Sequence, residues 1–323
     1  MAEPVYAEEV LDGHCHIAST HFIPRAFFEG VAGNIVAKLE ATGARKTVPD
    51  LIDSFLKLHN DHEADLLVHE MNEAGIAQSV LLLPDFTHAL RCELTIAEMF
   101  TRHEAVLRRH PGRFHVFAGV DPRWGDDGVQ LFERGLRDMG FRGLKLYPPC
   151  GYSPSDRRLY PFYELCRAYG VPVLMHIGPT SPCLSFDYSS PWLADQAARD
   201  FPDVDFILAH GAVHFVDDCV ALCGYRPNVF LDISAFTGST HPGGWAAGLA
   251  ELFRKGINHK ILFGTDWPVF RTGGGHKRLM QTFCAAEGPL AGVSLEQRRW
   301  IMRKNMQRLL ARAQARRAEP TSP

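Results

Sequence analysis

Four histidines and one aspartate stand at the ends of short apolar runs in this chain of 323 residues. His14 and His16 form a His-x-His pair, and His176, His210 and Asp266 each terminate a later run. Because side chains alternate between the two faces of a strand, His14 and His16 are expected to point the same way. Imidazoles and carboxylates are the groups that bind zinc and related divalent ions. The pattern predicts a divalent-metal site, provided that the fold brings the ends of these runs together.

Eight such runs recur, and longer stretches with helical periodicity separate them. The runs are Val10–Asp12, Ser79–Leu83, Phe114–Val120, Gly143–Tyr147, Val171–Ile177, Asp205–Ala209, Val229–Ile233 and Ile261–Gly264. Short, nearly all-apolar runs are typical of parallel strands that are covered on both faces. Eight alternating β and α units predict an α/β fold, a single (β/α)8 TIM barrel. A doubly wound open sheet is the alternative, although no glycine-rich dinucleotide-binding motif follows the first run.

The barrel is expected to fill the chain as one domain over residues 1–323, with a C-terminal helix. Residues 17–50 exceed what a barrel needs after its first strand, and they are expected to form either a cap over the mouth or an oligomer contact. Leu51 to Ala74 is interpreted as one amphipathic stretch, and residues 311–323 as a frayed tail. Three histidines of helical stretches are expected at the surface: His69, His103 and His110.

Composition narrows the class of protein. The chain has 34 Lys and Arg against 37 Asp and Glu, a net charge of −3, which argues against nucleic-acid binding. No apolar run reaches the roughly 18 residues of a transmembrane helix, and the acidic start is unlike a signal peptide. The eight cysteines lack zinc-ribbon spacing. We expect a reduced, cytoplasmic protein without a membrane partner.

All strands of a TIM barrel end at the same mouth, which would gather the four histidines and Asp266. Burying so many polar groups is costly unless they bind a metal ion or pair with one another. Asp232 and Ser234 share one face of the seventh run. They are expected to support a ligand histidine by hydrogen bonds, as metal sites usually require.

Several of these motifs resemble the amidohydrolase superfamily, and more narrowly its amidohydrolase-2 group of metal-dependent hydrolases and non-oxidative decarboxylases. The resemblance rests on the order and spacing of His14-Cys15-His16, His176, His210, Gly264-Thr265-Asp266-Trp267-Pro268, the run Gly143–Pro149 and the helix Asn305–Leu310. It covers most of the chain, from Asp12 to about Leu310.

The resemblance implies one metal ion per chain, usually Zn²⁺ with Mn²⁺ as the alternative. Its ligands would be His14, His16, His176 and Asp266, with His210 beside it as an acid, a base or a polarising group. The physical chemistry agrees, because zinc lowers the pKa of bound water from 15.7 to about 7. Asp266 would accept the proton of that water.

Three further residues are candidate substrate ligands: Lys145, Tyr147 and Arg271. Lys145 ends the fourth run, where some superfamily members carry a carboxylated lysine that bridges two metals. It is otherwise expected to attract a substrate anion or to pair with a carboxylate of the mouth. Tyr147 lies on the same face and either binds substrate or packs. The planar fork of Arg271 suits a carboxylate, although a solvated arginine is the common alternative.

Three functions remain open at this point. The first is a metal-dependent hydrolase that uses metal-activated water on an amide, ester or lactone of a small carboxylic or cyclic compound. The second is a metal-dependent non-oxidative decarboxylase of an aromatic or unsaturated acid. The third is a metal-free barrel hydrolase or binding protein. The partner is expected to be a small anionic or aromatic molecule, and the chain is expected to form a homodimer.

Overall fold

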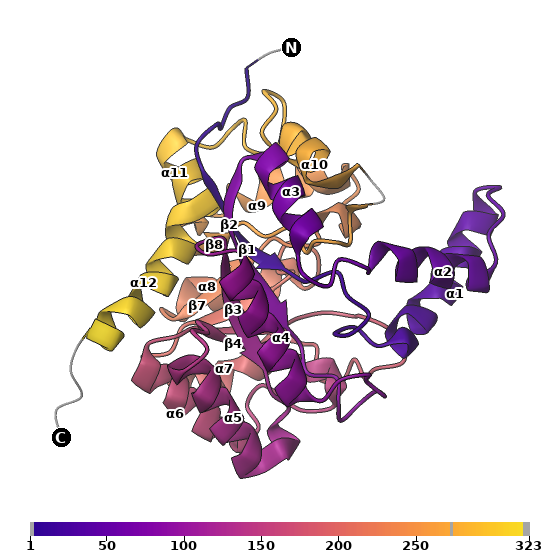
Figure 1. Cartoon of the computed structure of the whole chain (residues 1–323). Coiled ribbons are helices and arrows are strands. Elements are labelled where there is room, and N and C mark those ends of the chain that lie inside the picture. The colour runs from indigo at the N-terminus through magenta and orange to yellow at the C-terminus, as the bar shows by residue number, and fades with distance from the viewer. Residues whose placement is uncertain (1–2, 272–273, 319–323) are drawn as a thin grey trace.

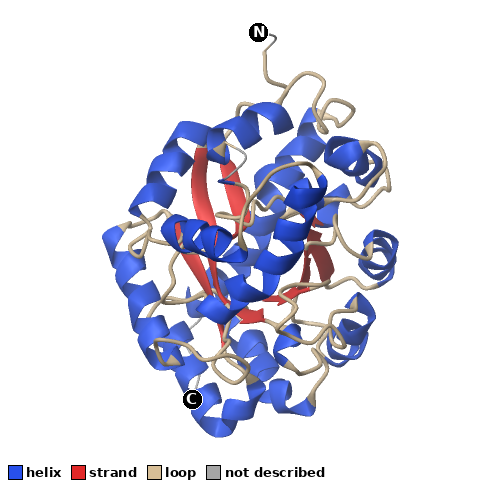
Figure 2. Ribbon diagram, turned by 90° about the vertical axis from the view of Figure 1, so that its right-hand side faces the viewer, coloured by secondary structure: helices blue, strands red, loops and turns tan. Residues whose placement is uncertain are grey.

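A single ring of eight parallel strands forms the centre of the protein in a computed structural model that describes residues 3–271 and 274–318. The strands follow one another in chain order, and helices surround them (Figures 1 and 2). Their bounds are β1 Val10–Cys15, β2 Ile76–Leu83, β3 Phe114–Gly119, β4 Gly143–Leu146, β5 Val173–His176, β6 Phe206–Ala209, β7 Val229–Asp232 and β8 Ile261–Leu262. The predicted (β/α)8 barrel is confirmed.

The ring closes between β8 and β1 through the segment that follows β8. Gly13 donates from its backbone nitrogen to the carbonyl of Phe263 at 2.8 Å, and His16 donates to the carbonyl of Trp267 at 2.9 Å. Gly264 lies so close to β1 that an added Cβ would stand 2.8 Å from the Cβ of His14. Glycine is therefore required where the last strand approaches the first.

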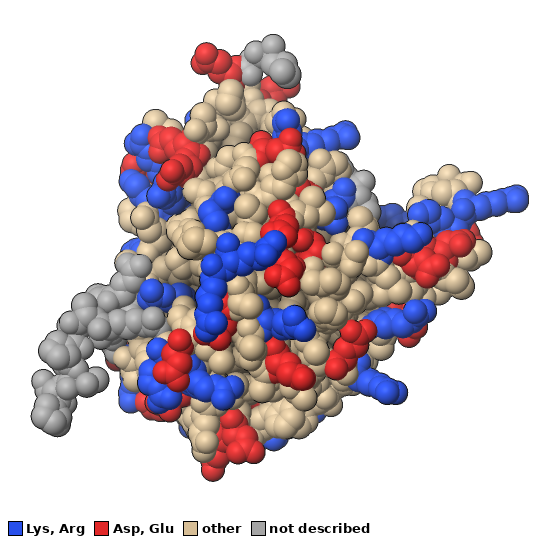
Figure 3. All heavy atoms as spheres, viewed as in Figure 1, with Lys and Arg blue, Asp and Glu red and all other residues tan. Residues whose placement is uncertain are grey.

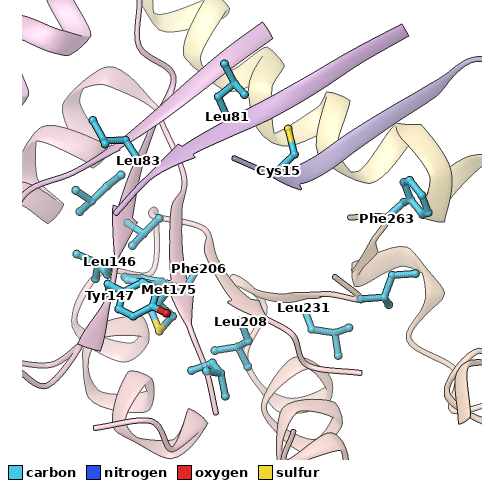
Figure 4. Packing of buried hydrophobic residues seen from close by; sticks show 14 of the residues in the cluster. Cys15, Leu81, Leu83, Leu146, Tyr147, Met175, Phe206, Leu208, Leu231 and Phe263 are labelled. Carbon is cyan, nitrogen blue, oxygen red and sulfur yellow. The ribbon is translucent and has the colours of Figure 1, made fainter. Parts of the chain in front are cut away.

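Two apolar layers hold the barrel together. One lies between the strands and the surrounding helices and includes Leu81, Met175, Leu208 and Leu231 (Figure 4). The other gathers the alternate strand residues with side chains of the C-terminal helix: Leu11, Val80, Leu82, Phe117, Leu174, Ile207, Ala209, Phe230, Leu262, Met306, Leu309 and Leu310. Strand alternation puts His176 on the same face as Leu174 and Asp232 on the same face as Phe230. Polar groups therefore replace the apolar ones at the carboxyl end of the interior.

Helices connect the strands, and three more α-helices follow the last strand within the described residues. Their bounds are α1 Arg25–Ala41, α2 Val48–Leu58, α3 Asp65–Ala74, α4 Ile96–Arg109, α5 Gly125–Arg137, α6 Tyr160–Tyr169, α7 Asp195–Asp200, α8 Val216–Tyr225, α9 Gly244–Leu252, α10 Gly275–Phe283, α11 Leu295–Arg299 and α12 Asn305–Ala318. The expected C-terminal helix is α12, which reaches Ala318. Of the predicted frayed tail, residues 319–323 lie outside the described part of the chain.

The helices α1 and α2 form a hairpin that projects from the barrel (Figure 1). We call this hairpin the cap. It has its own small apolar cluster, in which Ala32 and Val36 of α1 meet Leu51 and Ile52 of α2. The prediction of one amphipathic stretch over Leu51–Ala74 was wrong, because α2 ends at Leu58 and α3 begins at Asp65.

The break between α2 and α3 has a local cause. The carboxylate of Asp61 accepts hydrogen bonds from the backbone nitrogens of Leu66 and Leu67 at 3.1 and 2.9 Å, which satisfies free donors at the start of α3. Asn60 pairs with Ser19 in an isolated antiparallel bridge. The segment between the helices is therefore bound to the chain that leaves β1.

The surface has mixed charge on the face drawn in Figure 3, where basic and acidic side chains are interspersed. None of the described helices is both long and apolar enough to span a bilayer. The expectation that His103 lies at the surface was wrong, since it is 1% exposed and packs on Phe22, with 4.5 Å between ring centroids.

Candidate metal centre

Three of the predicted ligands converge at the carboxyl end of the barrel. The Nε2 atoms of His14 and His16 both lie 3.3 Å from Oδ1 of Asp266. Across the mouth, Nε2 of His210 lies 3.2 Å from Nδ1 of His176, and the His14 and His210 rings are 4.8 Å apart. Among the described residues, possible ligand atoms within 4.8 Å of one another form two groups, one of His14, His16 and Asp266 and the other of His14, His210 and Asp232. His176 belongs to neither group and stands next to His210.

The other ring nitrogen of each predicted ligand histidine is held by an acceptor. His14 bonds through Nδ1 to Oδ2 of Asp232 at 2.8 Å, and His16 through Nδ1 to the carbonyl of Leu82 at 2.9 Å. His176 bonds through Nε2 to the carbonyl of Gly178 at 3.1 Å. An acceptor at one nitrogen fixes the proton there and leaves the lone pair on the other. The lone pairs of Nε2 in His14, Nε2 in His16 and Nδ1 in His176 therefore face the mouth.

Asp232 and Ser234 provide the expected support. Oδ1 of Asp232 accepts from the backbone nitrogens of His210 at 3.0 Å and Ser234 at 2.9 Å, and from the Ser234 hydroxyl. The Ser234 oxygen lies 3.0 Å from Nδ1 of His14 and 2.8 Å from Nδ1 of His210. Asp232 and Ser234 are fully buried, so this network fixes two imidazoles against one strand end.

Two site residues have left-handed backbones that non-glycine residues seldom adopt. His210 and Asp266 both have φ of 61°. This conformation costs about 1–2 kcal/mol per residue. The cost is offset locally, because the His210 nitrogen donates to Asp232 and the Asp266 nitrogen donates to the His14 carbonyl at 2.8 Å. Such strained residues concentrate at functional sites.

Burial and neighbouring charge set the protonation of the site. Burial lowers the pKa of His16, lowers that of His176 well below its usual value and brings that of His210 to about 4. For His14 burial is the largest effect and acts in the same direction, but the Asp232 and Asp266 carboxylates together outweigh it and raise the pKa. Burial would raise the pKa of Asp266, yet the imidazoles of His14 and His16, 3.3 Å from its Oδ1, hold that pKa well below its usual value.

These atoms fit a divalent cation. Nε2 of His14 is buried and has no hydrogen-bond partner in the described chain, although a carboxylate oxygen lies 3.3 Å away. Two imidazole nitrogens and a carboxylate oxygen converge without a donor between them. A proton or a cation must stand there, and N/O donor sets of this kind suit zinc and manganese.

Lys145 and Tyr147 reach the same mouth from β4 and the residue after it. The Lys145 ammonium is 1% exposed and has no hydrogen-bond partner within the described residues. Burial lowers its pKa to about 8, against the opposing attraction of Asp232 and Asp266. The Tyr147 ring stacks on His176 at 4.5 Å and lies 5.7 Å from the Lys145 nitrogen. The lysine therefore presents an unpaired positive charge beside an aromatic face.

Aromatic rings continue this face outward to the cap. Tyr147 contacts Phe86 with ring centroids 4.9 Å apart, and Phe86 contacts Phe27 of α1 at 5.5 Å. The Tyr147 hydroxyl hydrogen-bonds to Thr180 at 2.6 Å. An apolar wall therefore leads from the cap to His176.

The third candidate substrate ligand, Arg271, is engaged by protein groups. Its Nε donates to Oε1 of Glu70 at 3.1 Å, and its Nη1 donates to the carbonyl of Leu58 at 2.9 Å. Its guanidinium lies 5.5 Å from the centre of the Trp267 ring.

Two acidic residues near the site were missed. Asp12 accepts from the backbone nitrogens of His14 and Thr265, each at 3.0 Å, and so joins β1 to the turn after β8. It stands in the motif that begins Asp-x-His, which was a usable signal. Glu70 lies on α3, far from every motif, and the sequence gives no indication of its role.

Comparison with known proteins agrees with the fold. A sequence model of the Amidohydrolase family matches residues 74–312, more than half of the chain. The search of curated proteins gave no match.

Three similar solved structures illustrate the range of proteins that share this fold. An uncharacterised TIM-barrel protein from Bordetella bronchiseptica has 22% identity and a TM-score of 0.66, over 95% of this chain and 99% of its own. A 5-carboxyvanillate decarboxylase from Novosphingobium aromaticivorans, with bound manganese and a methoxy-hydroxy-nitrobenzoic acid, has 12% identity, a TM-score of 0.63, and coverage of 95% and 97%. A 4-oxalomesaconate hydratase from Rhodopseudomonas palustris has 19% identity, a TM-score of 0.58, and the same coverage. At these identities the likeness establishes the fold alone.

Proposed function

The chain belongs to the amidohydrolase family, and from this premise we propose that it is a metal-dependent, non-oxidative decarboxylase of a small planar carboxylic acid. The residues that would hold the ion are His14 and His16 through Nε2, His176 through Nδ1, and Asp266 through Oδ1. One ion per chain, Zn²⁺ or Mn²⁺, matches this donor set. When bound, it would supply Lewis-acid stabilisation of negative charge on a substrate oxygen.

The observation that carries the proposal is the unpaired ammonium of Lys145 beneath an aromatic wall. A buried cation without a partner is unfavourable unless a ligand brings the opposite charge. The adjacent ring of Tyr147, stacked on His176, offers a flat apolar face. A planar anion satisfies both features, because its charge faces Lys145 while its ring lies against the aromatic side chains.

Decarboxylation of such an acid breaks the bond between the carboxyl carbon and the adjacent carbon. Carbon dioxide leaves, the electron pair stays on the remaining carbon, and one proton is added there. Lys145 would bind and orient the anion, while Phe27 and Phe86 would exclude water from the breaking bond. Nε2 of His210, beside His176, is placed to hold or move the proton.

Several solved relatives support this choice by the reactions in their names. Besides the carboxyvanillate enzyme, a 2,6-dihydroxybenzoate decarboxylase shares the fold. A dihydroxybenzoic acid decarboxylase from Polaromonas binds manganese and 2-nitroresorcinol. Their ligands are planar, oxygen-rich aromatic compounds, as the Lys145 and Tyr147 arrangement favours.

Hydrolysis of an amide, ester or lactone is the second candidate. The feature that favours it is the Asp266 carboxylate, which is ionised and points at the two imidazoles of β1. A carboxylate in this position is suited to take a proton from water. Neutral His210 would then polarise the carbonyl group.

A single assay separates the two reactions. Purified protein with Mn²⁺ or Zn²⁺ is incubated with a panel of dihydroxybenzoates, and with a panel of lactones and aryl esters. We expect release of carbon dioxide from the first panel, lost on chelation and restored by metal. Lys145→Met should abolish it, and Lys255→Met, a surface change, should not. Acid release from the second panel alone would replace decarboxylation by hydrolysis, and metal-independent turnover would refute both.

A further inference from the structure

We propose that Glu70 and Arg271 form a clamp that positions the Asp266 turn for metal binding and ties the cap to that turn. Both would be positioning residues, and Arg271 would serve the substrate only indirectly. The inference rests on the proposed metal-dependent function, which it deepens by naming what holds the ligand carboxylate in place.

Glu70 is the centre of the clamp. It lies on α3, its side chain is 14% exposed, and both carboxylate oxygens are used. Oε1 accepts from Nε of Arg271 at 3.1 Å. Oε2 accepts from the indole nitrogen of Trp267 at 3.1 Å and from the backbone nitrogen of His276 at 3.2 Å. One side chain of α3 therefore holds the turn after β8 and the start of α10 together.

Trp267 transmits this contact to the metal ligands. It follows Asp266 in the chain and is fully buried. Its carbonyl accepts from the backbone nitrogen of His16 at 2.9 Å. Its indole lies parallel to the His276 ring, with an interplanar angle of 9°. The residue that Glu70 holds is thus covalently joined to one predicted ligand and hydrogen-bonded to another.

Arg271 extends the clamp to the cap. Its Nη1 donates to the carbonyl of Leu58, the last residue of α2, which has no partner within the helix. A cation at this end also suits the helix dipole. The next residue, His59, accepts at its carbonyl from the backbone nitrogen of Thr20, on the chain that leaves β1. The foot of the cap is therefore fixed to the segment that carries Asp266.

Metal affinity measures this role directly. Partners that orient metal ligands change affinity on the order of 10- to 100-fold when removed. For Glu70→Gln and for Arg271→Lys we expect the Kd for Mn²⁺, measured from the free-ion electron paramagnetic resonance signal, to rise about 10-fold. Because the two residues act as one unit, the double variant should bind Mn²⁺ about as tightly as the single variant with the lower Mn²⁺ affinity.

The control lies one turn further along α3. Glu73 is exposed and stands 3.7 Å from Lys277 of α10, so Glu73→Gln removes a charge between the same two helices without touching Trp267. It should bind Mn²⁺ like the wild type. Thermal melting in the absence of metal identifies any variant that fails to fold. If Glu70→Gln does not fold, Arg271→Lys decides alone.

Wild-type Mn²⁺ affinity in folded Arg271→Lys, or strictly additive effects in the double variant, would overturn the clamp. A direct substrate role for Arg271 would instead raise KM for an anionic substrate while leaving Mn²⁺ affinity unchanged. If the wild-type protein itself bound no Mn²⁺, the proposed function would fail. A wild type that binds Mn²⁺ beside variants that bind it equally well would remove the clamp alone.

Discussion

Replacement of Asp232 by asparagine tests whether the tautomer of His14 controls metal binding. Oδ1 of Asp232 accepts two backbone N–H bonds, from His210 and Ser234, which an amide oxygen can also accept. The amide nitrogen must then face Nδ1 of His14, which is now 2.8 Å from Oδ2. Two N–H donors cannot face each other, and the only other hydrogen-bond contact of Nδ1 within the described residues is the Ser234 oxygen at 3.0 Å, so the proton of His14 is expected to move to Nε2. That is the nitrogen from which a metal ion would be bound.

The size of the effect follows from this mismatch. To bind metal, Nε2 must lose its proton. If Nδ1 stays unprotonated, it accepts from the amide, but the imidazole ring then carries a negative charge. If the proton moves to Nδ1, that N–H faces the amide N–H and one buried donor is left unpaired. An unsatisfied buried donor costs about 1–3 kcal/mol. This corresponds to a loss of affinity of roughly 5- to 150-fold, which overlaps the range seen for other supporting partners of metal ligands. The fold should survive, because the side chain keeps its shape and its backbone hydrogen bonds.

The assay is a Zn²⁺ or Mn²⁺ titration of wild type and Asp232→Asn, with melting of the metal-free proteins as the check on folding. Asp195→Asn serves as the control, because Asp195 is a partly exposed aspartate paired with Arg226 at 2.7 Å. It should change affinity less than twofold. A folded Asp232→Asn protein that binds metal as tightly as wild type would refute the tautomer argument.

Three further predictions follow from the site and its surroundings. Lys145→Met should leave the melting temperature unchanged or higher, because an apolar chain replaces a buried ammonium that has no hydrogen-bond partner. Turnover should fall at least 100-fold, and a lower melting temperature would show that the lysine is paired. His176→Ala should lose bound metal, whereas His210→Ala should retain it and lose turnover, as metal analysis by mass spectrometry will show; loss of metal from both would favour a two-metal site. His103 is buried, and burial lowers its pKa from 6.5 to about 4, so it binds a proton more readily in the unfolded chain than in the folded one. Its contribution to stability is therefore complete above pH 6.5 and is lost as pH falls towards 4, by up to about 3 kcal/mol. His59 and His115 have similarly lowered pKa values, so His103→Gln should reduce, without removing, the dependence of urea-unfolding stability on pH over that range; an unchanged slope would contradict the shift.

The positions of the site residues were predictable because they depend on local pattern and barrel symmetry. An apolar run followed by His176 or His210 needs no long-range information beyond the rule that all strands of a barrel end at one mouth. The support from Asp232 was predictable for the same reason, since Asp232 and Ser234 alternate on one strand. Family resemblance added the hypothesis of which of these groups would hold a metal ion.

The orientation of longer side chains was not predictable in this way. The sequence places Arg271 near the mouth, but its direction depends on Glu70, 201 residues earlier, on a helix that carries no motif. The break between α2 and α3 likewise depends on Asp61 and on a bridge to Ser19, so hydrophobic periodicity alone continued the helix through it. His103 appeared exposed because it lies among charged residues, whereas Phe22, on the segment between β1 and α1, covers it.

The charge balance of the mouth bears on the charge of the substrate. The charged groups that act on His210 include the Asp232 and Asp266 carboxylates, the Lys145 ammonium and, when it is protonated, the His14 imidazole. A metal ion at Nε2 of His14 would replace that proton, so the two carboxylates and the ammonium would then sum to −1. A divalent cation would bring the sum to +1, and a substrate with a single negative charge would bring it to zero. In a buried site an uncompensated charge is costly, so a dianion would leave one negative charge unmatched, whereas a neutral amide or ester would be matched together with the hydroxide that hydrolysis requires. For the proposed decarboxylation we therefore expect a monoanionic substrate, which a simple aromatic carboxylate is at neutral pH.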